Sequence, residues 1–207
     1  NIPVNIITSL LIIMGGLGFI VYLDIFKVLK DYKEKKHFFK RLTLHSKIVL
    51  TSTFILIFGG ALLFFVFEYN NPLTMQNYSL SQRITVSLFE SITTRTAGFF
   101  TVPQDQLREV SRLFSCFLMY IGGSPVGTAG GVKTVTVAVV LLSCGSILAG
   151  HEDTECFRRC IPMNIVRTAL SVCIGGLLLV LVGTLALMVA EPEATIMQAT
   201  YEVVSAT

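Results

Sequence analysis

The sequence predicts an all-α integral membrane protein, built from helix–pore-loop–helix repeats with re-entrant pore helices and one broken transmembrane helix. Composition is the first observation behind this prediction: 53% of the 207 residues are hydrophobic and 14% are charged, whereas a soluble domain carries about 25% charged residues. The second is the presence of four apolar stretches of about 20 residues or more, the length that crosses a bilayer. The third is a cluster of glycines inside one of them. The composition excludes a disordered chain, and a net charge of +3 is too small to indicate a nucleic-acid partner.

Three of the apolar stretches, residues 2–25, 48–67 and 169–190, predict ordinary spans. The remaining stretch lies within residues 107–149, which is about twice the length that one crossing requires. Its centre, residues 122–131 (the glycine loop), contains five glycines and a proline. Because proline removes a hydrogen-bond donor and glycine disfavours a helix, the helix should break here. Lipid cannot satisfy the freed backbone groups, so the loop is expected to line a permeation path; the alternative is a surface loop between two separate helices.

The basic residues predict the orientation in the membrane. Eight of the sixteen Lys and Arg residues lie between Lys27 and Lys47. Short basic loops stay in the cytoplasm, so residues 27–45 and 150–163 are both expected there. The chain should therefore cross the cell membrane several times.

Residues 81–94 predict a short amphipathic helix, which at about 14 residues cannot cross the bilayer. The spans on either side both face outside at this point, so the helix should enter and leave by the same face, as a pore helix does. Small and hydroxyl residues follow it (residues 94–98, the filter segment). Consecutive carbonyls of an extended backbone can replace the water around K⁺, and Gly98 permits backbone conformations that point a carbonyl inward.

An internal echo supports a repeated architecture. The sequence Phe89-Glu90-Ser91-Ile92-Thr93-Thr94 returns as Tyr201-Glu202-Val203-Val204-Ser205-Ala206, 112 residues later (202 minus 90). The echo follows an apolar span and an outer loop, as the first copy does. Because the chain begins without Met and ends inside a helix-like pattern, we expect it to be a fragment of a longer chain.

Several motifs resemble the Trk/Ktr/HKT superfamily of potassium transporters, and within it the KtrB/TrkH-like translocating subunits. They are SITTRTAGF (91–99), GGSP (122–125), TAGGVKT (128–134) and GGLGF (15–19). The resemblance implies four helix–pore-loop–helix repeats around one K⁺ pore. On this pattern the chain divides into the last helix of a preceding repeat (1–26), a basic cytoplasmic loop (27–45), a complete repeat (46–149), a second cytoplasmic loop (150–163), and the start of the next repeat, truncated before its filter (164–207).

The resemblance also implies the site. The filter would comprise Thr94, Arg95, Thr96, Ala97 and Gly98, with K⁺ held by the backbone carbonyls of Thr94, Thr96 and Ala97. The gate would be the glycine loop and the lysine beyond it, namely Gly122, Gly123, Ser124, Pro125, Val126, Gly127, Thr128, Ala129, Gly130, Gly131 and Lys133. Val126 departs from the family pattern, in which glycine is more usual.

The partners that the resemblance implies are the lipid bilayer, a second copy of the chain in a homodimer, and a cytosolic nucleotide-binding (RCK-type) regulatory subunit. K⁺ would be the transported ion, some members would use Na⁺ as a coupling ion, and no covalent cofactor is expected. Potassium uptake is therefore the leading prediction. The alternatives are a sodium-selective or sodium-coupled transporter of the same superfamily, an unrelated secondary transporter with a broken helix, and a membrane enzyme using Ser124, Glu90 and His151. No nucleophile–base pair, metal cluster or phosphate loop favours the enzyme.

Individual polar residues carry further expectations. Arg95 and Glu90 should form a buried ion pair or a hydrogen-bonded brace around the filter, because a cation in the pathway would repel K⁺. Lys133 should either contact gate groups or extend toward the cytoplasm. Cys156 and Cys160 are expected on one helical turn, without the further ligands that a zinc site needs.

Overall fold

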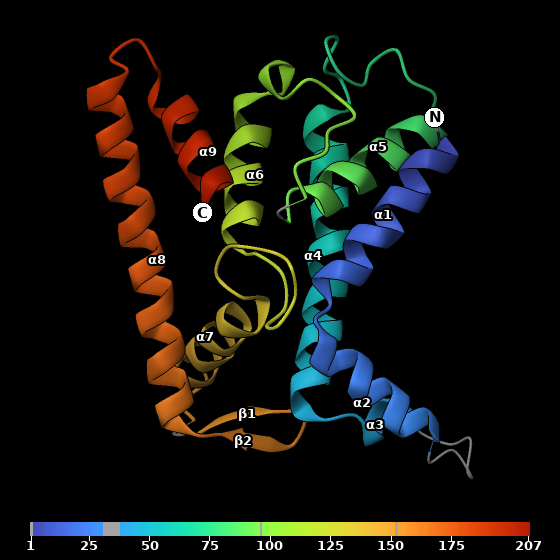
Figure 1. The fold of residues 1–207 in the computed structure, drawn as a ribbon, viewed down its shortest axis with the longest axis vertical. Coiled ribbons are helices and arrows are strands. Elements are labelled where there is room, and N and C mark those ends of the chain that lie inside the picture. Colours follow the sequence, from blue (N-terminus) through green and yellow to red (C-terminus); the bar gives the residue numbers. More distant parts are fainter. Residues whose placement is uncertain (1, 31–37, 96, 152) are drawn as a thin grey trace.

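The computed structural model describes residues 2–30, 38–95, 97–151 and 153–207, and most of them are helical. Figure 1 shows long helices along the molecular axis, with shorter helices between them. In chain order the elements are α1 (Ile2–Gly16), α2 (Phe19–Lys30), α3 (Phe38–Arg41), α4 (Leu44–Glu68), α5 (Leu80–Thr93), a 3-10 turn (Gln104–Gln106), α6 (Glu109–Tyr120), α7 (Thr134–Leu148), β1 (Thr154–Cys156), β2 (Arg159–Ile161), α8 (Met163–Ala190) and α9 (Ile196–Ala206).

Helices α4 and α8 are the two long apolar helices, with 25 and 28 residues. At 1.5 Å per residue they measure about 38 and 42 Å, enough to cross a hydrocarbon core of about 30 Å. α8 leaves large apolar side chains exposed along its length, among them Leu170, Ile174, Leu178, Leu181, Leu185 and Val189. Exposed apolar surface of this extent suits contact with lipid. The predicted spans over residues 48–67 and 169–190 are confirmed as helices of sufficient length and hydropathy.

Helix α5 is the short helix that the sequence predicts after the first of these spans. It begins with a capping box between Ser79 and Gln82 and packs against α4. At the contact, Ser91 Oγ lies 2.8 Å from the Ile57 carbonyl, to which it donates. Gly60 makes this approach possible, because a Cβ there would lie 2.3 Å from Ser91 Oγ.

Helix α9 begins in the same way as α5. A capping box joins Thr195 and Gln198, and the helix follows α8 through a short connection, as α5 follows α4 (Figure 1). The order of long helix, loop and capped short helix therefore occurs twice, in agreement with the echo in the sequence.

The first apolar stretch is not the single straight span that the sequence predicts. It is divided into α1 and α2, which meet at 90° across Leu17 and Gly18. Gly18 has φ +78°, a left-handed conformation that glycine adopts without steric cost. The expectation of an ordinary span was wrong because this break depends on another part of the chain, described below, that packs into the bend.

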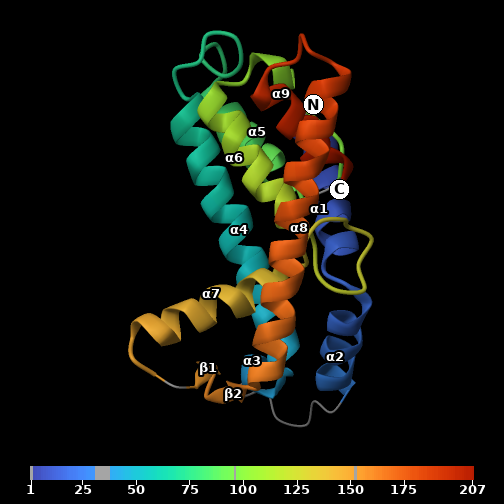
Figure 2. The same cartoon turned by 90° about the vertical axis from the view of Figure 1, so that its left-hand side faces the viewer.

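The third apolar stretch is broken as predicted. Its halves are α6 and α7, and the chain between them is irregular. An isolated parallel bridge between Ile121 and Val132 closes the base of this segment. α6 runs along the long axis of the molecule in Figure 1 and α7 projects sideways from that axis in Figure 2, so the two halves do not form one continuous helix.

The loop after α7 contains an antiparallel hairpin instead of the helical turn expected around Cys156 and Cys160. β1 and β2 pair with Glu155 opposite Cys160. Phe157 and Arg158 make the two-residue connection with φ of +49° and +62°, the backbone signs of a tight hairpin turn. The described residues hold no group of three or more metal-ligating side chains.

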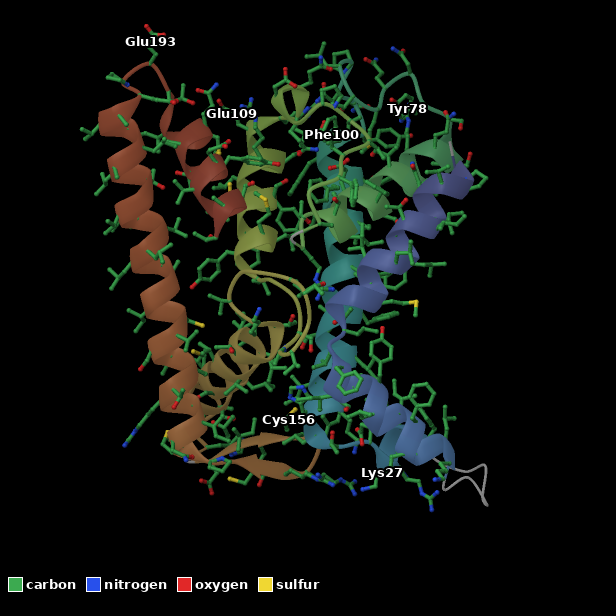
Figure 3. The ribbon with its side chains drawn as sticks, in the orientation of Figure 1. Lys27, Tyr78, Phe100, Glu109, Cys156 and Glu193 are labelled. Atoms are coloured by element: carbon green, nitrogen blue, oxygen red, sulfur yellow. The ribbon has the colours of Figure 1, made fainter. Side chains whose placement is uncertain are left out.

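The two ends of the molecule carry different loops. Figure 3 shows Lys27 and Cys156 near one end, and Tyr78, Glu109 and Glu193 near the other. The two loops predicted to be cytoplasmic therefore lie at a common end.

Candidate ion filter and gate

The filter segment leaves α5 through a turn and not directly as an extended strand. The amide of Thr94 donates to the Glu90 carbonyl at 3.1 Å, and that of Ala97 donates to the Thr93 carbonyl at 3.0 Å. These bonds tie Thr94 and Ala97 to the last turn of α5, which differs from the extended strand expected from residue 94. Thr96 lies outside the described residues. Within the part of the chain that the structure describes, the carbonyls of Thr94 and Ala97 accept no hydrogen bond.

Gly98 has a left-handed backbone conformation. Its φ is +74°, and a Cβ at this position would meet nothing within 4 Å. Its requirement for glycine is therefore conformational and not steric. Thr93 holds the next residues in place, because its hydroxyl accepts a hydrogen bond from the Phe99 amide at 3.1 Å.

Two hollows flank the filter segment. One has a volume of about 320 Å³ and is lined by Thr94, Ala97 and Gly98 together with α9. The other, of about 760 Å³, is lined by Ala97, by α1 and by the glycine loop at Thr128. The structure thus brings the filter segment and the glycine loop, two of the predicted site elements, to one space.

Glu90 is a buried brace for the chain that follows the filter. Its side chain is fully buried, and one carboxylate oxygen accepts from the Thr101 hydroxyl at 2.9 Å. The other oxygen accepts from Gln104 Nε2 at 3.0 Å. Gln104 in turn accepts from the Tyr201 hydroxyl of α9 at 2.8 Å. Of the two expectations for Glu90, the hydrogen-bonded brace is the one observed.

Arg95 is also a hydrogen-bonded side chain and is not paired with Glu90. Its side chain is 9% exposed. Nη2 lies 3.5 Å from the hydroxyl of Thr53 on α4 and 3.5 Å from that of Thr134 on α7. The sequence did not point to either threonine, because both contacts join residues about 40 positions apart. Arg95 therefore packs between α4 and α7, and it also lines the hollow of about 760 Å³ beside the glycine loop.

The glycine loop folds back tightly on itself. A Cβ on Gly122 would lie 1.8 Å from the Gly130 carbonyl, so only glycine fits at this crossing. Lys133 donates from Nζ to the Ala129 carbonyl at 2.6 Å. This contact favours the first of the two expectations for Lys133, an interaction with gate groups. Val126 has φ +59°, which is the conformation that the usual family glycine would adopt without strain.

The same loop fills the bend between α1 and α2. The Ser124 amide donates to the Gly16 carbonyl at 2.9 Å, and the Phe19 amide donates to the Val126 carbonyl at 3.3 Å. A Cβ on Gly18 would lie 2.4 Å from the Pro125 carbonyl. Backbone groups released at one break are therefore satisfied by the other break, as burial at membrane depth requires.

A family model described as TrkH, cation transport protein, matches residues 1–207. The chain belongs to the TrkH family. This confirms the resemblance seen in the filter and glycine-loop motifs. It also agrees with the predicted class, a membrane transporter and not an enzyme, and removes the unrelated secondary transporter from the alternatives.

Among relatives of this TrkH family chain, the Ktr system potassium uptake protein B of Bacillus subtilis is 36% identical over 203 residues, covering 98% of the chain and 44% of that protein. The potassium/sodium uptake protein NtpJ of Enterococcus hirae is 37% identical over 191 residues, covering 92% of the chain and 40% of that protein. The chain thus spans less than half the length of these relatives.

A solved structure shares the fold of this TrkH family chain. The potassium transporter TrkH from Vibrio parahaemolyticus matches with a TM-score of 0.76 and 15% sequence identity, over 99% of the chain and 42% of that structure. The helical membrane architecture predicted from the sequence is confirmed by this match.

Proposed function

We propose that the chain is part of a subunit for potassium uptake across the cell membrane, with residues 94–98 as one wall of a selectivity filter and the glycine loop as an intramembrane gate. The observation that carries the proposal is the pair of carbonyls of Thr94 and Ala97. They accept no hydrogen bond among the described residues, and both residues line a hollow at the C-terminal end of α5. Unpaired carbonyls and the negative end of a helix dipole both favour a bound cation.

The assignment of the gate rests on the place of the glycine loop. It lines the hollow of about 760 Å³ together with Ala97 and Arg95 of the filter segment. An ion that leaves the filter on this side would meet the loop next. Its bonds to the α1–α2 bend hold it in the position seen here, and a displacement of the loop would clear the path.

Two details of the proposal come from the relatives. The two relatives are named for potassium uptake and for potassium/sodium uptake, so we propose K⁺ as the transported ion and keep a sodium-selective or sodium-coupled transporter as the second candidate. We further propose that the subunit works as a homodimer with a cytosolic nucleotide-binding regulatory subunit, and that residues 27–45 and 150–163 face that subunit from the cytoplasm.

The test compares two glycines with the same backbone conformation. Gly98 and Gly150 have φ of +74° and +77°, and a Cβ at either would meet nothing within 4 Å. A serine at each position should cost about 1–2 kcal/mol of backbone strain, but only Gly98 lies in the filter segment. In the full-length protein, expressed in cells lacking other K⁺ systems, Gly98→Ser should reduce rubidium uptake or its discrimination against Na⁺. Gly150→Ser should leave both unchanged.

Equal uptake and equal discrimination in the two variants would contradict the filter assignment. Wild-type protein that takes up Na⁺ in preference to rubidium would favour the second candidate.

A further inference from the structure

Arg95 is a buried cation in the filter segment whose partners are uncharged. Its guanidinium is held by two threonine hydroxyls, from Thr53 and Thr134, and its Nε atom is buried with no hydrogen-bond partner among the described residues. A buried charge is costly unless hydrogen bonds satisfy it. The position of Arg95 therefore depends on a small number of contacts. The loss of one contact should shift the backbone of the filter segment.

The two threonines belong to different parts of the fold. Thr53 lies within α4. Thr134 is the first residue of α7, and its hydroxyl donates to the Gly122 carbonyl at 2.8 Å while its amide donates to the Gly123 carbonyl at 3.0 Å. A hydroxyl has one hydrogen and two lone pairs. Thr134 gives its hydrogen to the glycine loop, and a lone pair remains for Arg95.

A small hollow of about 10 Å³ lies at the same junction. It is lined by Arg95 of the filter segment, Gly123 of the glycine loop, Gly16 of the α1–α2 bend, and three isoleucines from α1 and α5. The filter, the loop and the bend therefore meet at Arg95, with almost no free space between them.

We propose that Arg95 is a positioning residue that couples the filter to the gate through Thr134. The inference rests on the proposed function. When the glycine loop moves, Gly122 withdraws from Thr134, the hydroxyl turns away, and Arg95 loses one of its two partners. Arg95 lies between Thr94 and Ala97, so the ion-facing carbonyls shift with it. Opening of the gate and relaxation of ion discrimination are then linked.

The test uses Thr53 and Thr134 as a matched pair, because each hydroxyl is 3.5 Å from the same nitrogen. Full-length protein in liposomes is assayed for rubidium and sodium uptake. Thr134→Val should raise the rubidium flux and lower the rubidium/sodium ratio by about tenfold, the change expected from losing one hydrogen bond to a charged group. Thr53→Val should lower the ratio without raising the flux. Thr134→Ser, which keeps the hydroxyl, should restore both.

A double variant separates coupling from two independent effects. Arg95→Gln should lower the ratio, and combining it with Thr134→Val should lower it no further, because Arg95→Gln already removes the contact with Thr134 that Thr134→Val removes. Additive losses, or a raised flux with an unchanged ratio in Thr134→Val, would overturn the coupling. If wild-type protein shows no selective rubidium uptake, the proposed function itself fails; if uptake is selective and the losses add, only the coupling fails.

Coupling between two sites is reciprocal, so a change in the filter segment should also alter the glycine loop. This effect can be measured without any variant of Thr134. Val126 is 65% exposed, so a cysteine there, with Cys144 and Cys160 replaced by serine, reports the state of the loop. Arg95→Gln should change its rate of labelling by a membrane-impermeant maleimide several-fold. An unchanged rate would also overturn the inference.

Discussion

The two interrupted stretches of the chain break in opposite ways. Between α1 and α2 the interruption is two residues long, and a single left-handed glycine, Gly18, turns the chain by 90°. Between α6 and α7 the chain forms a long loop with bonds of its own. The Gly122 amide donates to Val132 at 3.0 Å, and the Gly127 amide donates to Ser124 at 3.2 Å.

The difference shows which break depends on the other. Both breaks supply part of their own hydrogen bonding, but two backbone groups of the short bend find partners only in the long loop. These groups, the Gly16 carbonyl and the Phe19 amide, are met by the glycine loop. An unsatisfied backbone group away from water costs several kcal/mol, so the bend is stable where the loop docks against it.

The most severe test of this dependence is Gly18→Ala. The new Cβ would lie 2.4 Å from the Pro125 carbonyl, and the residue would also carry a left-handed backbone. Overpacking and strain together should destabilise the folded protein by about 2–5 kcal/mol and push the loop out of the bend. The unfolding temperature in detergent would measure the destabilisation, and rubidium uptake would measure the effect of displacing the loop.

Gly59→Ala is the control for this substitution, because a Cβ on Gly59 in α4 would meet nothing within 4 Å. If Gly18→Ala were as stable and as active as Gly59→Ala, the bend and the loop would not be interlocked.

Lys133→Met tests the bonds that the loop makes within itself. It removes the contact of 2.6 Å between Nζ and the Ala129 carbonyl, which should cost about 1.5–3 kcal/mol. With that bond gone the loop is less firmly closed, so rubidium flux should rise. Lys47→Met is the matched control, because Lys47 Nζ also donates to a backbone carbonyl, that of Lys40 at 3.0 Å, but far from the loop. A rise in flux in both variants would refute a specific effect on the gate.

Val126→Gly should have the smallest effect, in the opposite direction. Val126 has φ +59°, and glycine would remove the left-handed strain at the cost of a more flexible unfolded chain. The net gain should be about 0.5–1 kcal/mol, measured as a higher unfolding temperature. Arg158→Gly, at φ +62° in the hairpin, should give a similar gain. A loss of stability in Val126→Gly alone would mean that its side chain makes contacts that hold the loop.

The comparison also explains what could be predicted from the sequence. The spans over residues 48–67 and 169–190, the short helix before the filter segment and the glycine loop follow from local signals, namely apolar length, amphipathic pattern and glycine clusters. The bend at Gly18 could not be predicted, because its hydrogen-bond partners lie more than 100 positions away in the chain.

Other features escaped prediction for the same reason. Thr94 and Ala97 are tied to α5 because the last turn of this helix offers free carbonyls to their amides. The contacts of Arg95 with Thr53 and Thr134 exist only once α4, α5 and α7 have packed. Cys156 and Cys160 lie in a hairpin whose strands are too short to show, in the sequence, the alternation of polar and apolar residues that is typical of a strand.

The hydrogen bond between Gln104 and Tyr201 bears on how the protein is made. These residues are 97 positions apart, so the ribosome must synthesise α6, α7 and all of α8 before Gln104 meets its partner. Until then the Glu90 brace beside the filter segment has only its local contacts. The two repeated units therefore do not mature independently, and a mutation in the later unit can impair the earlier one.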